Sequence, residues 1–287
     1  MSDQITTAFV QQYKGTLYNL VQQKGSRLRE AVTVETVNGE AGYFDQIGAT
    51  AAVERTTRHS DSPLVNTPHA RRQVTMRDFE WGDLIDNPDK VRLLTDPSST
   101  YLQSAMWALG RKIDDILIEA ALGTAKTGKT GATAVTLPSG QKIAHASSGL
   151  TLAKLRTAKE LLDAAETDPD DPRFMLVTTK QMSNLLATTE VTSADYNTVK
   201  TLVQGELDTF LGFKFVRTQR LTQDATPNRQ VIAWCKSGML LALGSDIKGR
   251  VIERPDKSFS VYAYASLSCG ATRMEEEKVV EIACVES

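Results

Sequence analysis

The chain has 287 residues, which is long enough for one elaborated domain or two modest ones with a sizeable core. Hydrophobic residues make up 41% and charged residues 24%, both ordinary for globular proteins, so a wholly disordered or fibrous chain is excluded. The formal net charge of -2, from 33 basic and 35 acidic residues, excludes a global attraction to nucleic acid or to a membrane surface.

The apolar runs and the cysteines exclude further classes of protein. The longest apolar runs, such as MLLAL at 239–243, are far shorter than the roughly 20 residues of a membrane span, and the first residues lack a signal-peptide core. We therefore expect no membrane partner. Three cysteines, Cys235, Cys269 and Cys284, have no C-x-x-C spacing, which predicts free buried thiols in a reducing compartment.

The N-terminal third is poor in core-forming residues. Apolar residues between Ile5 and Val32 have helical spacing but are interrupted by Gly15 and Gly25, which predicts short helices in an arm. The following stretch mixes β-branched residues with turn formers, and residues 54–77 are locally basic. Because unsupported loops longer than about 12 to 15 residues are uncommon in compact domains, we interpret this stretch as an extended hairpin that packs on another subunit.

A long helix is the clearest predicted element. Asp96 can cap it, Pro97 suits its first turn, and Gly123 ends it. One face is apolar, with Leu102, Ala105, Met106, Leu109, Ile113, Ile116, Leu117 and Ala120. The roughly 25 residues would span about 37 Å, long enough to serve as a backbone for other elements.

The second half alternates helices and strands. A strand is expected around 134–137, and apolar residues from Leu152 to Ala165 predict a second amphipathic helix that ends at TDPDDP. RFMLVTT then predicts a strand, KQMSNLLA a short helix and FLGFKFVRT another strand. Further strands are expected at QVIAWC, GMLLAL, FSVYAYASLSC and KVVEIACV. The fold class is therefore α+β.

Residues 123–130, GTAKTGKT, match the phosphate-binding pattern GxxxxGK[ST] at every required position. A phosphate-binding loop needs a strand before it and a helix after it, because the helix N-terminus attracts the anion. Here the loop follows a helix C-terminus, where the dipole is negative, and GATAVTLPSG follows it in place of a helix. We interpret it as a flexible loop after a helix stop.

The sequence indicates no catalytic, cofactor-binding or metal-binding residues. No GxSxG, HExxH or C-x-x-C pattern occurs. Acidic residues cluster at Asp114 and Asp115 and again at Asp168, Asp170 and Asp171, but neighbours in sequence lack the facing geometry of an acid and base pair. Surface or subunit contact is the favoured role for both clusters.

Several stretches resemble the major capsid proteins of tailed bacteriophages with the Hong Kong 97-type fold. DPSSTYLQSAMWALGRKIDDILIEAALG is similar to their spine helix, and HSDSPLVNTPHARRQVTMRDFEWGDLID to the return of their extended loop. GELDTFLGFKFVRTQRL resembles a passage of their axial domain, and KSGMLLALGSDIKGRVIERPD the segment that leads back to the peripheral sheet.

The resemblance implies a domain order for nearly the whole chain. It comprises an N-terminal arm (1–35), an extended β-hairpin loop (36–78), a peripheral domain with the spine helix (79–135), an axial domain (136–257) and C-terminal return strands of the peripheral domain (258–287). Such a subunit assembles with itself into hexamers and pentamers of an icosahedral shell around double-stranded DNA. Assembly in the host bacterial cytoplasm and a final place in the virion capsid are implied, with no enzymatic activity and no cofactor.

The resemblance also implies partners. A portal and packaged DNA, held by non-specific contacts at the inner surface, are expected, and decoration proteins where a head carries them. Because the chain begins almost directly at the arm, we expect scaffolding to be a separate protein. Arg55, Arg58, Arg71 and Arg72 are candidates for contact with acidic surface on the next subunit, with Asp114, Asp115, Asp168, Asp170 and Asp171 as candidate acidic partners.

Two alternatives stay open at this stage. An encapsulin-like nanocompartment shell shares the fold and would hold an enzyme cargo, and a P-loop hydrolase would depend on Lys129.

Overall fold

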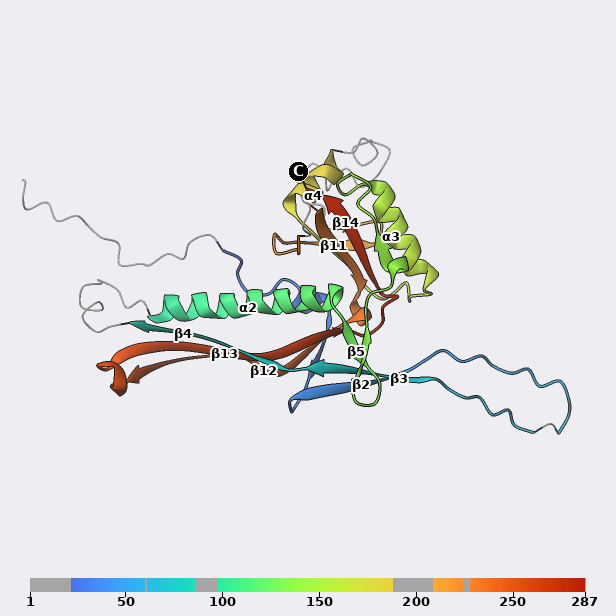
Figure 1. Cartoon of the computed structure of the whole chain (residues 1–287), viewed down its shortest axis with the longest axis horizontal. Coiled ribbons are helices and arrows are strands. Elements are labelled where there is room, and N and C mark those ends of the chain that lie inside the picture. The colour runs from blue at the N-terminus through green and yellow to red at the C-terminus, as the bar shows by residue number, and fades with distance from the viewer. Residues whose placement is uncertain (1–21, 60, 86–97, 188–208, 224–227, 287) are drawn as a thin grey trace, which may run out of the picture. The chain divides into compact units, whose positions relative to one another are not determined.

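The computed structural model describes residues 22–59, 61–85, 98–187, 209–223 and 228–286. Within these ranges the chain combines helices with three β-sheets, so the α+β class is confirmed (Figure 1). No helix in the described part is long and apolar enough to cross a membrane.

The predicted long helix is α2 (Ser98–Leu122). Most of its apolar stripe is buried as expected, with Ala105, Leu109, Ile113, Ile116 and Leu117 all at most 4% exposed. Met106, predicted on the same face, is instead 42% exposed. The predicted cap, Asp96 with Pro97, lies outside the described residues. Gly123 follows the helix, and its N–H donates to the carbonyl of Glu119 at 2.8 Å, which confirms the predicted stop.

The described part of the N-terminal arm contains one turn of 3-10 helix, η2 (Arg29–Ala31), while residues 5–21, where most of the predicted short helices fall, lie outside it. The arm crosses α2 at a glycine: a Cβ on Gly110 would lie 2.6 Å from the Cα of Gly25. The absence of a side chain at Gly110 therefore lets the two backbones meet.

A six-stranded sheet forms the centre of the second half, in the order β7 (Lys142–Ile143), β14 (Val279–Val285), β11 (Asn228–Cys235), β8 (Arg173–Val177), β10 (Phe213–Arg217) and β9 (Thr209–Phe210). Every residue of β8 is buried, as its continuous apolar sequence predicts for a central strand. The strand expected at FLGFKFVRT is divided into β9 and β10, because Leu211 and Gly212 both adopt positive φ and turn the chain.

Two helices accompany this sheet, and both are confirmed. α3 (Leu152–Ala164) contacts β14 and β7, and its buried apolar residues include Leu155 and Leu162. α4 (Thr179–Leu186) begins with a capping box between Thr178 and Gln181. The helical spacing of apolar residues in α3 was visible in the sequence, so this helix could be predicted without long-range information.

A four-stranded sheet of hairpins has the order β2 (Ala41–Ile47), β3 (His69–Thr75), β5 (Ala125–Thr127) and β6 (Thr133–Val135). β2 and β3 pair antiparallel over seven residues each, which confirms the predicted extended hairpin. One face of this sheet covers a small core that includes Val74, Phe44 and Leu240, and the other face is open to solvent.

The third sheet has the order β1 (Thr33–Thr36), β12 (Met239–Arg254), β13 (Ser260–Arg273) and β4 (Arg77–Ile85). β12 is 16 residues long, much longer than the predicted strand GMLLAL, because its polar second half continues the sheet. Residues 258–287 were grouped as one set of return strands, but β13 lies in this sheet and β14 in the six-stranded one.

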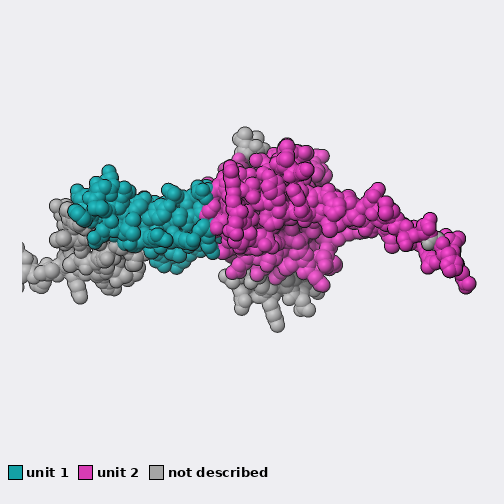
Figure 2. Space-filling model, turned by 90° about the horizontal axis from the view of Figure 1, so that it is seen from below, with its two compact units in different colours: residues 1–26, 78–111, 245–267 teal, residues 27–77, 112–244, 268–287 magenta. Residues whose placement is uncertain are grey.

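The chain forms two compact units, coloured separately in Figure 2. Unit 1 comprises residues 1–26, 78–111 and 245–267, and unit 2 comprises residues 27–77, 112–244 and 268–287. The chain passes from one unit to the other between residues 26 and 27 and inside β4, α2, β12 and β13.

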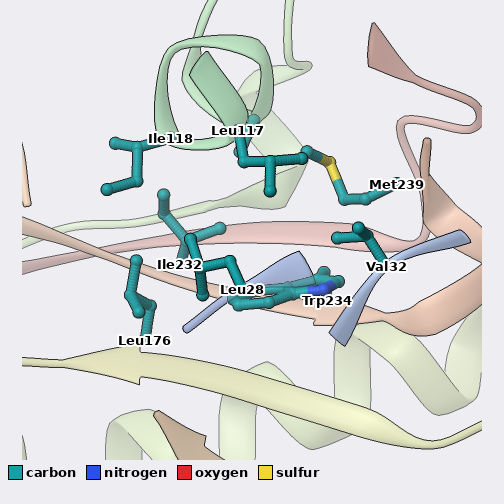
Figure 3. A pocket seen from close by; sticks show the side chains of 9 residues that line it. Leu28, Val32, Leu117, Ile118, Leu176, Ile232, Trp234 and Met239 are labelled. Atoms are coloured by element: carbon teal, nitrogen blue, oxygen red, sulfur yellow. The ribbon is translucent and has the colours of Figure 1, made fainter. Parts of the chain in front are cut away.

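Unit 2 contains a small apolar pocket where α2, β8, β11 and the arm come together (Figure 3). Leu28, Val32, Leu117, Ile118, Ala121, Leu176, Ile232, Trp234 and Met239 line it. Its cavity of about 10 Å³ has room for about one water molecule at most, so these side chains form packed core and not a ligand site. The Trp234 Nε1–H donates to the carbonyl of Ala31 at 2.9 Å, which ties the arm to this core.

Candidate subunit-contact surface

The β2–β3 loop (residues 48–68) is the most exposed feature of the described chain. Every described residue from Ile47 to Ala70 is exposed, and the loop runs out beyond the strands of its hairpin (Figure 1). It carries large apolar side chains into solvent: Ile47 is 71%, Val53 61% and Leu64 93% exposed. These apolar side chains leave water only if a partner covers the segment, so burying them would favour a contact.

Arg55 and Arg58, two of the predicted contact residues, lie on this loop and are exposed. The Nε–H of Arg55 donates to the carbonyl of Thr57 at 3.1 Å, within the loop itself. Their guanidinium groups are therefore placed where a second molecule could reach them.

The structure separates the adjacent residues Arg71 and Arg72, because successive side chains of a strand point to opposite faces. Arg71 lies on the open face and donates to both carboxylate oxygens of Asp45, at 2.5 and 3.0 Å. The hydrogen bond from Arg71 lowers the pKa of Asp45 below its usual value. Arg72 is only 7% exposed, and it donates to the carbonyl of Met274 at 2.9 Å and to Glu276 at 2.5 Å. Arg72 thus holds the hairpin sheet to the segment after β13.

The two acidic residues on α2 also have partners inside the chain. Asp114 is 1% exposed and accepts hydrogen bonds of 3.2 Å from the backbone N–H groups of Arg27 and Leu28. Asp115 pairs with Arg220, whose Nε and Nη2 both donate to it at 2.6 Å. Asp114 therefore anchors the arm to the helix, whereas Asp115 remains half-exposed.

The third acidic group lies in the turn between α3 and β8. Asp168 and Asp170 are exposed, and the carboxylate of Asp168 accepts the N–H of Asp170 at 3.0 Å. Asp171 is half-buried and accepts the hydroxyl of Ser237 at 2.5 Å. Of this group, Asp168 and Asp170 are the residues best placed for a contact outside the chain.

GTAKTGKT folds as a β-hairpin, which corrects the prediction of a flexible loop. β5 and β6 pair antiparallel, and β5 also pairs with β3. Gly128 and Gly131 have positive φ of 93° and 70°, and a Cβ on Gly131 would lie 1.8 Å from the Oε1 of Gln73. Lys129 is exposed at the tip, beside an open hollow that Arg71 also lines. No helix follows the turn, so nothing supplies the N-terminal N–H groups of a phosphate site.

The side chain of Arg273 occupies the backbone carbonyls at the C-terminal end of α2. Its guanidinium is fully buried and donates to four backbone carbonyls, those of Ala120, Ala121, Gly123 and Val135, at 3.2, 2.8, 2.6 and 3.1 Å. A cation at a helix C-terminus complements the negative end of the dipole. Desolvation lowers the pKa of Arg273. Sequence reasoning missed this residue, because the contact spans about 150 positions of the chain.

Lys154 forms a similar internal site, also missed from the sequence. Its ammonium group, on a side chain only 6% exposed, donates to the carbonyls of His145, Ser148, Gly149 and Ala283 at 2.8, 2.9, 3.0 and 3.0 Å. The enclosed segment contains two residues of positive φ, Ala146 and Ser147. Desolvation lowers the pKa of Lys154. The lysine thus holds a strained turn against β14.

The three cysteines are free and buried, as predicted. Desolvation raises the pKa of Cys235, and it raises the pKa values of Cys269 and Cys284 to about 11. In the described part of the chain, no group of three or more His, Cys, Asp or Glu side chains is arranged to hold a metal ion.

Comparison with known proteins places this architecture. Residues 5–286 match the model of a protein family described as phage capsid protein. A search of curated proteins found no match.

Solved structures with the same fold are distant in sequence. The capsid of the cyanophage P-SCSP1u is 17% identical, with 99% of this chain and 95% of that chain covered and a TM-score of 0.76. The capsid of Ralstonia phage GP4 is 9% identical, with 98% and 96% covered and a TM-score of 0.78. The head structure of Helicobacter pylori bacteriophage KHP40 is 10% identical, with 99% and 98% covered and a TM-score of 0.74.

Proposed function

Because the chain belongs to the phage capsid protein family, we propose that it is the subunit whose hexamers and pentamers close the icosahedral head shell around double-stranded DNA. The protein is a structural component of the phage head and part of the virion capsid. Its role in this proposal is to make contacts and not to catalyse a reaction, and no cofactor is needed.

The observation that carries the proposal is the β2–β3 loop. A segment in which all described residues are exposed, including Val53 and Leu64, has no core of its own to bury them in. In a shell, the same segment gains that core from the next copy, and the apolar surface leaves water on assembly. The exposed loop therefore serves to join one subunit to the next.

The exposed charges also support a contact between the loop and the next copy. Arg55 and Arg58 are exposed on the loop, and Asp168 and Asp170 are exposed on the turn between α3 and β8. We infer that Arg55 and Arg58 on the loop meet the acidic turn of a neighbouring copy. Arg72 and Asp114 are buried with partners inside the chain, so they serve the subunit itself.

The remaining partners follow from the same role. A closed head needs a portal for DNA passage and a means of setting its curvature, for which we propose a separate scaffolding protein. With a formal net charge of -2, DNA contacts at the inner surface would be local and non-specific. Decoration proteins, where present, would bind outside.

Expression of the chain, alone and with scaffolding protein, tests the proposal. We expect closed hollow particles by electron microscopy for the full-length chain. A variant in which an Asn-Gly turn replaces residues 49–67 should keep a folded subunit, because the Gly48 N–H to Pro68 carbonyl bond of 2.8 Å still closes the hairpin, but it should form no particles.

Two controls make the result interpretable. Circular dichroism and thermal unfolding must show that the shortened subunit is folded. Normal particles from the shortened variant would refute the assigned role of the loop. Particles that contain a co-purifying enzyme in place of nucleic acid would support a nanocompartment shell instead.

A further inference from the structure

The outer edge of β2 is an open strand edge. β2 is the terminal strand of its sheet, and its only strand partner in the described part of the chain is β3. Met76 donates its N–H to the carbonyl of Glu40 at 2.9 Å, and Gly48 donates to that of Pro68 at 2.8 Å. In an antiparallel pair these bonds recur at every second residue, so they fix which backbone groups face β3.

The alternation divides β2 into two sets. The inward residues, which bond to β3, are Gly42, Phe44 and Gln46. The outward residues, whose N–H and C=O groups point away from β3, are Ala41, Tyr43, Asp45 and Ile47. No described residue forms a backbone hydrogen bond with the outward set. The edge therefore presents four N–H and four C=O groups in regular spacing.

This edge lacks the usual protections against pairing with another chain. Natural edge strands are blocked by lysine, proline, bulges or a covering segment. β2 contains no lysine or proline, and its register with β3 is continuous over all seven residues. Its one charged side chain, Asp45, is already paired with Arg71, and Ile47 is 71% exposed. The edge is thus suited to accept an added strand.

The same hairpin supplies an unpaired segment in the β2–β3 loop. Residues 48–59 contain no proline, include Val53 and three threonines, and are exposed throughout. Within one copy this segment leaves from the end of β2 and does not return along its edge. We propose that the outer edge of β2 receives the β2–β3 loop of a second copy of this chain as an added strand.

Such a contact is heterologous, because a loop on one copy meets a strand edge on the next. Heterologous contacts close into rings when their rotation allows it, which is the geometry that hexamers and pentamers require. The inference rests on the proposed function, since only a shell of identical copies places a second loop beside every edge. The inference also specifies that the copies are joined by backbone hydrogen bonds, which give affinity without demanding a particular side-chain sequence.

Residue-resolved hydrogen exchange is the first test, with wild-type subunits and wild-type particles. We expect the inward amides to be protected in both states. The outward amides should exchange freely in the subunit and at least about 10-fold more slowly in the particle, as amides gain protection when they are hydrogen-bonded. Equal exchange of the outward amides in both states would overturn the inference.

Cross-linking between copies is the second test. Subunits carrying Ile47→Cys and subunits carrying Val53→Cys are co-assembled and treated with a short bismaleimide. The three native cysteines are fully buried, so only the introduced thiols react. We expect a covalent dimer from this pair and none when Ser139→Cys, at an exposed site elsewhere, replaces Val53→Cys.

The outcomes separate this inference from the proposed function. Absence of particles from the wild-type chain with its scaffold refutes the proposed function. Normal particles that link Ile47→Cys only to another Ile47→Cys would show an edge that pairs with itself, and would overturn the present inference alone.

Discussion

Replacing Arg273 with methionine should destabilise the subunit strongly. The side chain is fully buried, and the substitution removes donors from four carbonyls, three of them at the end of α2. A buried carbonyl without a partner costs about 1–3 kcal/mol, and the lost desolvation penalty of the cation offsets part of the sum. For Arg273→Met we therefore expect the free energy of unfolding to fall by about 3–5 kcal/mol.

Urea unfolding of the soluble subunit, followed by tryptophan fluorescence, measures this change. Arg156→Met is the matched control, since Arg156 is exposed on α3, and it should change the free energy by less than about 0.5 kcal/mol. Arg273→Lys keeps the charge with fewer donors and should fall between the two. If Arg273→Met unfolds within about 1 kcal/mol of the wild type, the assigned role of the guanidinium is wrong.

Three further outcomes are expected. Arg72→Glu should lower the urea midpoint of the subunit, because it places two carboxylates together in a buried site, whereas Arg71→Glu should leave the midpoint nearly unchanged; equal shifts would contradict the separation of these neighbours. Isothermal titration with ATP should give no saturable binding to the wild type or to Lys129→Ala, and binding lost only in the variant would restore the nucleotide hypothesis. Stability should be full below pH 9.0 and fall as the pH rises toward about 11, because burial raises the pKa values of Cys269 and Cys284 in the folded state, so the unfolded state loses its protons first. The fall should be smaller in the double variant Cys269→Ala/Cys284→Ala.

Elements with a strong local signal could be predicted from the sequence. α2 and α3 have apolar stripes of helical period, and β8 is a short continuous apolar run, so each was recognisable without its neighbours. The long hairpin was also predictable, because its polar composition leaves few residues for a core.

Elements that depend on partners could not be predicted. The second half of β12, SDIKGRVIER, has little strand pattern, and it is a strand because it continues an existing sheet. From the sequence, Arg71 and Arg72 were both expected to contact the next subunit, although neighbouring residues of a strand point to opposite faces of the sheet. Arg273 binds carbonyls that lie far away in the chain, and so is one of the four carbonyls that Lys154 binds, that of Ala283; no local pattern indicates such contacts.

The turn around Lys154 has a further consequence for a particle that leaves its host. Rings of backbone carbonyls are the groups with which proteins commonly hold potassium ions, and here the positive charge is an ammonium attached to the chain. A bound ion would be lost by dilution in a medium poor in that ion. The ammonium group of Lys154 is part of the chain, so it stays among these carbonyls in cytoplasm, in fresh water or in brine.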